Sequence, residues 1–212
     1  MSRIAEIFAT GRPVTMAPNG MVTSPHAMAS EAGVSVLRTG GSAVDAAIAT
    51  SASLSVLYPH MCGVGGDAFW LVFDAQMGRI HYLDGAGVSA RTGTIEAFGA
   101  RGLREIPLRG PLPATLTTPG AVASWCEAHA AFGRLPLADV LGTAVSLAKE
   151  GFPVTERLAR WIGHTVAQGV FSDAAKAIFG PTGNLPSPSA LLRNPDLALT
   201  LERIASDGHP GF

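Results

Sequence analysis

The sequence contains few charged side chains: 15% of its 212 residues are Asp, Glu, Lys or Arg, against about 25% in an average globular domain. Lys and Arg together number 15 and Asp and Glu 16, which gives a formal net charge of -1. A chain this close to neutrality is not a strongly basic nucleic-acid binder. Aromatic residues make up only 7% of the chain, too few for a surface that stacks bases. We therefore expect no nucleic-acid partner.

Long apolar runs are also missing. The longest apolar segment, residues 46–58, is shorter than the ~18 to 20 residues that span a bilayer, and it is interrupted by Thr50 and by serines. Residues 1–8 lack the apolar stretch of a signal peptide and include Glu6. These absences predict a cytoplasmic protein with no membrane partner.

Cysteine is scarce, because only Cys62 and Cys126 are present. Their spacing to each other and to His60 does not fit a metal site, and a cytoplasmic location disfavours a disulfide. We interpret them as two buried thiols. The sequence predicts no metal site and no cofactor.

Apolar residues are abundant, at 47%, and follow helical periods in much of the chain. A short strand is expected at residues 21–23. Ser24 and Pro25 predict the N-cap and first position of a helix that ends at Gly40 and Gly41. The next helix, over residues 42–57, is apolar nearly all round, which predicts a buried central helix.

A β-hairpin is expected next, with strands at residues 68–73 and 79–83. The run Phe69–Phe73 is apolar on both faces, as in a central strand. The remainder is predominantly helical, with helices predicted at 118–132, 137–150, 155–161 and 194–205. We find no repeat and no long linker, and therefore expect no domain boundary within residues 1–212.

A glycine loop separates the second helix from the hairpin. Gly63, Gly65 and Gly66 lie between a helix and a strand, the reverse of the order in a dinucleotide-binding loop. The glycines therefore predict tight packing against another backbone, or N–H groups available to an anion. His60, beside this loop, fits either a structural hydrogen bond or a role in ligand binding or proton transfer.

The residues alone do not provide a complete catalytic set. Thr117 and Thr118 precede Pro119, so they predict a helix cap rather than a nucleophile. The serine-hydrolase, zinc-protease and phosphate-loop motifs are absent from the sequence. Composition and motifs indicate a lightly charged domain with extensive interfaces.

Several blocks, in order and spacing, resemble the N-terminal part of the γ-glutamyltranspeptidase precursor. They cover nearly all of the chain: GMVTSPH (20–26), VLRTGGSAVDAA (36–47), Pro59-His60 with GVGGDAF (63–69), TPGAVA (118–123), FGRLP (132–136), AKEGFPV (148–154) and NPDLA (194–198).

This resemblance implies an α/β protein of the α+β type, part of a four-layer αββα sandwich of the N-terminal-nucleophile hydrolases. The segment itself should be mostly helical with a central β-hairpin. The family's precursor cleaves itself into two subunits, and its nucleophile is a Thr at the new N-terminus of the small subunit. Residues 1–212 would then be the large-subunit portion, inactive alone, with the small subunit as partner and a small-molecule amide as substrate. Association into a homo-oligomer is a further expectation.

The sequence departs from the family where an Asp-x-Arg-Glu motif leaves the hairpin. The resemblance places the substrate-carboxylate Arg at Ala86 and the Glu at Gly87; a second branch of the family carries its Arg at Val88. A charged contact of this kind is worth roughly 1.5–3 kcal/mol, so its loss argues against ordinary glutathione chemistry. We assign substrate binding to Arg91, with Asp84 and His60.

Two alternatives stay open beside a γ-glutamyltranspeptidase-like amide hydrolase or acyl transferase. One is an amidohydrolase that acts on a non-glutamyl amide, of the oxamate or acyl-lactam type. The other is a non-catalytic scaffold or assembly subunit that has kept the fold and lost the reaction.

Overall fold

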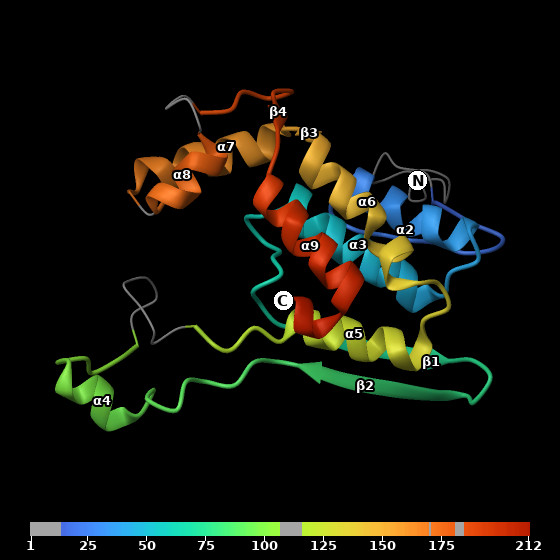
Figure 1. Cartoon of the computed structure of the whole chain (residues 1–212), viewed down its shortest axis with the longest axis horizontal. Coiled ribbons are helices and arrows are strands. Elements are labelled where there is room, and N and C mark those ends of the chain that lie inside the picture. The colour runs from blue at the N-terminus through green and yellow to red at the C-terminus, as the bar shows by residue number, and fades with distance from the viewer. Residues whose placement is uncertain (1–13, 107–115, 170, 181–184) are drawn as a thin grey trace, which may run out of the picture.

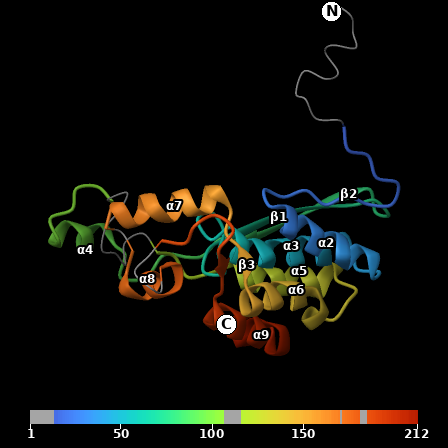
Figure 2. The ribbon, with the colours of Figure 1, turned by 90° about the horizontal axis from the view of Figure 1, so that it is seen from above.

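A computed structural model describes residues 14–106, 116–169, 171–180 and 185–212. Figures 1 and 2 show a layer of helices beside a β-hairpin, with two helical arms that extend away from them. Residues 1–8, on which the expectation about a signal peptide depends, lie outside the described residues.

The core is formed by helices that pack around one central helix. Helix α2 (Ala27–Arg38) packs on α3 (Ala43–Leu57), which packs on α6 (Leu137–Glu150), and α6 packs on α9 (Pro195–Asp207). Ile48, Ala52 and Leu57 of α3 are each 0% exposed. The expectation of a buried central helix is therefore confirmed.

The hairpin consists of β1 (Ala68–Asp74) and β2 (Arg79–Gly85), paired antiparallel with Leu71 opposite Tyr82. Helix α5 (Ala121–Phe132) covers the face that carries Trp70 and Leu83. The opposite face is uncovered in the described structure and exposes a row of large apolar side chains: Phe69, Leu71, Phe73, Ile80 and Tyr82. The hairpin is present as predicted, but the described residues bury only one of its two apolar faces.

The remaining elements form the arms and short connections. One arm carries α4 (Ile95–Ala100), and the other carries α7 (Glu156–Ala167) and α8 (Asp173–Phe179) (Figure 1). The two-residue strands β3 (Phe152–Pro153) and β4 (Leu191–Leu192) pair antiparallel with each other. The 3-10 helix η1 spans His209–Gly211.

The structure corrects the predicted boundaries of two helices and removes one predicted strand. Helix α2 begins at Ala27 rather than Pro25, because the Ser24 hydroxyl bonds the backbone of His26 and forms a turn before the helix. The segment 21–23 is not a strand. Helix α7 continues to Ala167 instead of ending at Trp161, and buries Ile162 and Thr165.

The two cysteines are free, as expected, but only half-buried rather than fully buried. Partial burial raises the pKa of both thiols, Cys62 and Cys126. Within the described residues, no helix is both long and apolar enough to cross a membrane.

Candidate functional site

Three chain segments meet where the chain leaves strand β2 of the hairpin. We call residues 86–89, which follow β2, the hairpin exit. The carbonyl of Gly66, in the glycine loop, accepts hydrogen bonds from the N–H groups of Gly120 (3.0 Å) and Ala121 (2.9 Å) at the start of α5. The Thr118 N–H donates to the Val88 carbonyl over 2.9 Å. We call residues 66–67, 85–89 and 117–120 the glycine junction.

This arrangement corrects the predicted role of Thr118 as a helix cap. Helix α5 begins at Ala121 with Gly120 at its N-cap, and no side chain caps it. The Gly66 carbonyl instead satisfies the first N–H groups of the helix. The glycine loop therefore helps to define where α5 begins.

Glycine allows the close approach of backbones at the junction. A Cβ at Gly87 would overlap the Thr118 carbonyl oxygen, and one at Gly120 would overlap the Gly85 carbonyl oxygen. In contrast, a Cβ at Gly63 or Gly65 meets no described atom within 4 Å, and one at Gly66 reaches only the Gly63 carbonyl at 4.0 Å. Tight packing against another backbone, expected at Gly63, Gly65 and Gly66, occurs in the described chain at other glycines.

Two exposed carboxylates accept hydrogen bonds from successive backbone N–H groups of the hairpin exit. Asp84 accepts from the Ala86 N–H, and Asp67 accepts from the Gly87 N–H, each over 2.9 Å. Because both N–H groups already have acceptors, neither is available to a substrate anion. The side chains at the expected arginine positions, Ala86 and Val88, are uncharged and exposed. The hairpin exit is consequently negative rather than positive.

Arg91 is the nearest basic residue in sequence that follows this exit. It lies in an exposed turn that is closed by a 2.8 Å hydrogen bond from the Gly93 N–H to the Ala90 carbonyl. No ion pair involves Arg91 among the described residues. Its guanidinium is therefore available for an anion, as its predicted role requires.

His60 lies in an aromatic cluster. Its ring centroid is 4.1 Å from that of Tyr58 and 5.4 Å from that of Trp161 in α7. Burial lowers the pKa of His60, and the positive charge of Arg157 lowers it further. Among the described residues, no hydrogen bond, ion pair or ring contact joins His60 to Asp84 or Arg91.

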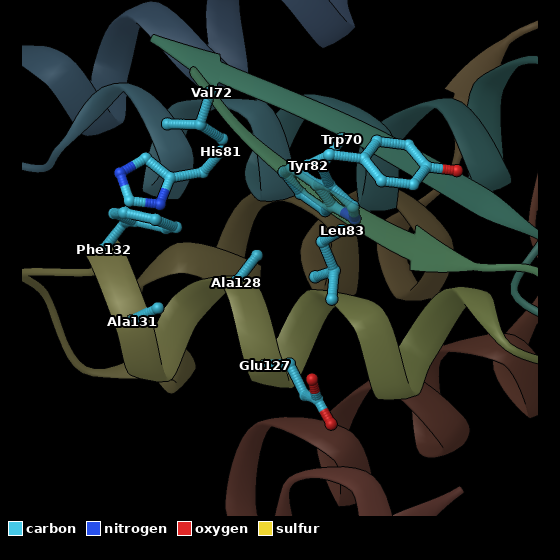
Figure 3. A pocket seen from close by; sticks show the side chains of 9 residues that line it. All are labelled: Trp70, Val72, His81, Tyr82, Leu83, Glu127, Ala128, Ala131 and Phe132. Carbon is cyan, nitrogen blue, oxygen red and sulfur yellow. The ribbon is translucent and has the colours of Figure 1, made fainter. Parts of the chain in front are cut away.

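A cavity of about 240 Å³ lies between the hairpin and α5. His81 and Phe132 meet edge to face at its rim, with ring centroids 5.0 Å apart. The Trp70 Nε1–H donates to the Ser124 hydroxyl over 3.0 Å and ties the hairpin to the helix. Figure 3 shows the lining side chains on both elements. None of the predicted site residues lines this cavity.

Sequence reasoning missed Asp67 and the close contact of Gly87 with Thr118. The position of Asp67, a carboxylate directly after three closely spaced glycines, is the signal that could have identified the first. The second depends on two segments that are about 30 residues apart in sequence, so no local pattern reports it.

The chain is similar to known proteins over most of its length. Residues 29–212 match the family described as gamma-glutamyltranspeptidase. The chain is 40% identical over 192 residues to the glutathione hydrolase-like YwrD proenzyme of Bacillus subtilis, covering 91% of this chain and 36% of that protein. It is 38% identical over 199 residues to the oxamate amidohydrolase proenzyme of Klebsiella pneumoniae, covering 92% and 37%.

Solved structures show the same fold. The cephalosporin acylase from Bacillus halodurans has a TM-score of 0.85 at 38% identity, covering 92% of this chain and 37% of that one. The γ-glutamyltranspeptidase of Helicobacter pylori also has a TM-score of 0.85, at 28% identity, covering 94% and 58%.

The fold is therefore part of an N-terminal-nucleophile hydrolase, mostly helical with one antiparallel hairpin, as the resemblance implied. The chain belongs to the γ-glutamyltranspeptidase family. It spans little more than a third of the length of the two curated relatives described above.

Proposed function

We propose that this chain is the large-subunit portion of a precursor that cleaves itself and then hydrolyses, or transfers the acyl group of, a small-molecule amide. The observation that carries the proposal is the match to proenzymes of this family over about nine-tenths of the chain. The nucleophile would be a Thr on the small subunit, activated by its own α-amine. Residues 1–212 would supply scaffold and substrate contacts, without an internal domain boundary.

The uncovered face of the hairpin supports a partner subunit. Leu71 is 78% exposed and Phe73 66% exposed, in a row with other apolar side chains. Contiguous apolar patches of this kind mark interfaces in folded proteins. The partner we propose is the remainder of the same precursor. Cytoplasmic location and homo-oligomerisation stay predictions.

The negative hairpin exit favours a non-glutamyl amide over a γ-glutamyl substrate. A γ-glutamyl group would place its α-carboxylate near Asp67 and Asp84, with no Arg at Ala86 or Val88. An incompletely paired carboxylate is costly to desolvate. The similarity to an oxamate amidohydrolase and to acylases supports a smaller or less zwitterionic amide.

The test uses the complete protein that contains these residues. Mass spectrometry should detect its cleavage into two subunits, and the processed enzyme should be assayed with a γ-glutamyl anilide, oxamate and an acylated lactam. We expect turnover with an amide other than the γ-glutamyl anilide. Cleavage and turnover both absent would favour the non-catalytic scaffold, and efficient use of the γ-glutamyl anilide would overturn the substrate assignment.

Arg91→Ala tests which side chain recognises the anion. We expect KM for oxamate to rise about tenfold, the ~1.4 kcal/mol scale of one lost charged contact. Arg101→Ala, another exposed arginine of the same arm, is the matched control and should leave KM unchanged. An equal KM for wild type and Arg91→Ala would place the anion contact elsewhere.

A further inference from the structure

Asp67 is placed to hold the three segments of the glycine junction together. Its neighbour Gly66 accepts the first N–H groups of α5, and the Asp67 carboxylate reaches across to the Gly87 N–H over 2.9 Å. Gly87 is 20 residues away in sequence. Two adjacent residues thus connect the glycine loop to both the helix and the hairpin exit.

Asp67 is the one described acceptor of the Gly87 N–H. The other link across the exit, from Thr118 to Val88, joins a different pair of segments. A carboxylate is a strong acceptor for a backbone N–H. Strand pairing ends at Ala68 and Gly85, so Asp67 adds a side-chain link between the glycine loop and the exit just beyond the last strand pair.

We propose that Asp67 is a positioning residue of the amidase, which fixes the hairpin exit and, through it, the turn that carries Arg91. This inference rests on the proposed function and adds a residue to it. Asp67 touches backbone rather than substrate. Its loss should therefore change how well the acyl group is held and leave the chemistry of the proposed small-subunit nucleophile unchanged.

Because Asp67 is exposed, its role in positioning can be tested separately from any contribution to the stability of the fold. Asp67 is exposed, so water can replace its carboxylate at the Gly87 N–H with little loss of folding free energy. Order in residues 85–91 should decrease while the fold remains intact. An amide oxygen can accept the same hydrogen bond, so asparagine should preserve the effect of aspartate.

The experiment compares Asp67→Ala and Asp67→Asn in the complete protein, with Asp74→Ala as the matched control. Asp74 also accepts backbone N–H groups, those of Gln76 and Met77, but at the opposite end of the hairpin. Hydrogen exchange of residues 84–91, thermal unfolding, and KM and kcat for the amide that is turned over are measured for each.

We expect Asp67→Ala to speed exchange at the Gly87 amide about tenfold and to raise KM by a similar factor, with kcat and Tm close to wild type. Asp67→Asn should restore both, and Asp74→Ala should change neither. Unchanged exchange or unchanged KM in Asp67→Ala would overturn the positioning role while turnover itself still supports the proposed function. Absence of all turnover in the wild type would refute the proposed function, and the exchange data would still show whether Asp67 holds the exit.

Discussion

The carboxylate of Asp45 is 0% exposed and joins two helices. It accepts the Ser42 N–H over 2.8 Å, completing the capping box at the start of α3, and the Arg134 N–H over 2.9 Å, in the turn before α6. One buried side chain therefore satisfies backbone donors that are about 90 residues apart.

Asp45→Ala should leave these donors without an acceptor and lower stability by about 3 kcal/mol, with a lower Tm. Asp45→Asn, which keeps one acceptor oxygen, should cost less. Thermal unfolding of the complete protein measures both. The control Asp139→Ala removes an exposed carboxylate at the start of α6 and should change stability by less than about 0.5 kcal/mol. Equal losses at Asp45 and Asp139 would contradict the proposed link that Asp45 makes between α3 and the turn before α6.

Gly87 and Gly63 give opposite expectations for the same substitution. Gly87→Ala forces a Cβ against the Thr118 carbonyl, which belongs to backbone and cannot rotate away, so we expect a loss of about 1–3 kcal/mol. Gly63→Ala enters open space and should be neutral within about 0.5 kcal/mol. Chemical denaturation distinguishes the two. A neutral Gly87→Ala would show that the hairpin exit is not packed on Thr118.

At the scale of elements, the hairpin exposes on its outer face a row of large apolar side chains that the described chain does not cover. Its outer face presents Leu71 at 78% and Ile80 at 67% exposure, and neither outer edge of the two strands pairs with another described strand. An exposed apolar face and free strand edges both favour association.

Leu71→Lys should therefore reduce the binding of a hydrophobic dye by the isolated chain and impair subunit association in the complete protein. Leu199→Lys is the control, because Leu199 is also exposed, at 54%, but lies on α9 away from the hairpin. Dye fluorescence and size-exclusion chromatography measure the two effects. Equal responses of the two variants would mean that the hairpin face is not a special interface.

At the scale of the whole molecule, the 212-residue chain should have no amidase or transferase activity by itself. The proposed nucleophile and its α-amine belong to the small subunit, so the chain would supply binding contacts without the reacting group. Purified chain assayed with γ-glutamyl anilide and simple amides should show background rates. Turnover that a substitution within residues 1–212 abolishes would contradict this expectation.

The local sequence determined most helices correctly. The predicted helices start at Ser42, Thr155 and Asn194, and these residues cap α3, α7 and α9 in the structure. A capping side chain acts on N–H groups two or three residues away, so such a start can be predicted from the local sequence. Helix α6 and the hairpin at residues 68–85 were also predictable, because their apolar patterns are contained within short stretches of sequence. The ordered blocks also identified the family, which the comparisons confirm.

Only the tertiary structure decided how the candidate site is assembled. The N-terminus of α5 is satisfied by the Gly66 carbonyl rather than by Thr118. The glycines in close contact with backbone include Gly87 and Gly120, whereas a Cβ at Gly63 or Gly65 would meet no described atom within 4 Å. These contacts join segments tens of residues apart, so no local pattern specifies them. The sequence by itself determined the helices α3, α6 and α9 and the hairpin, because their signals are local. The packing of three distant segments determined which backbone groups at the hairpin exit are already hydrogen-bonded.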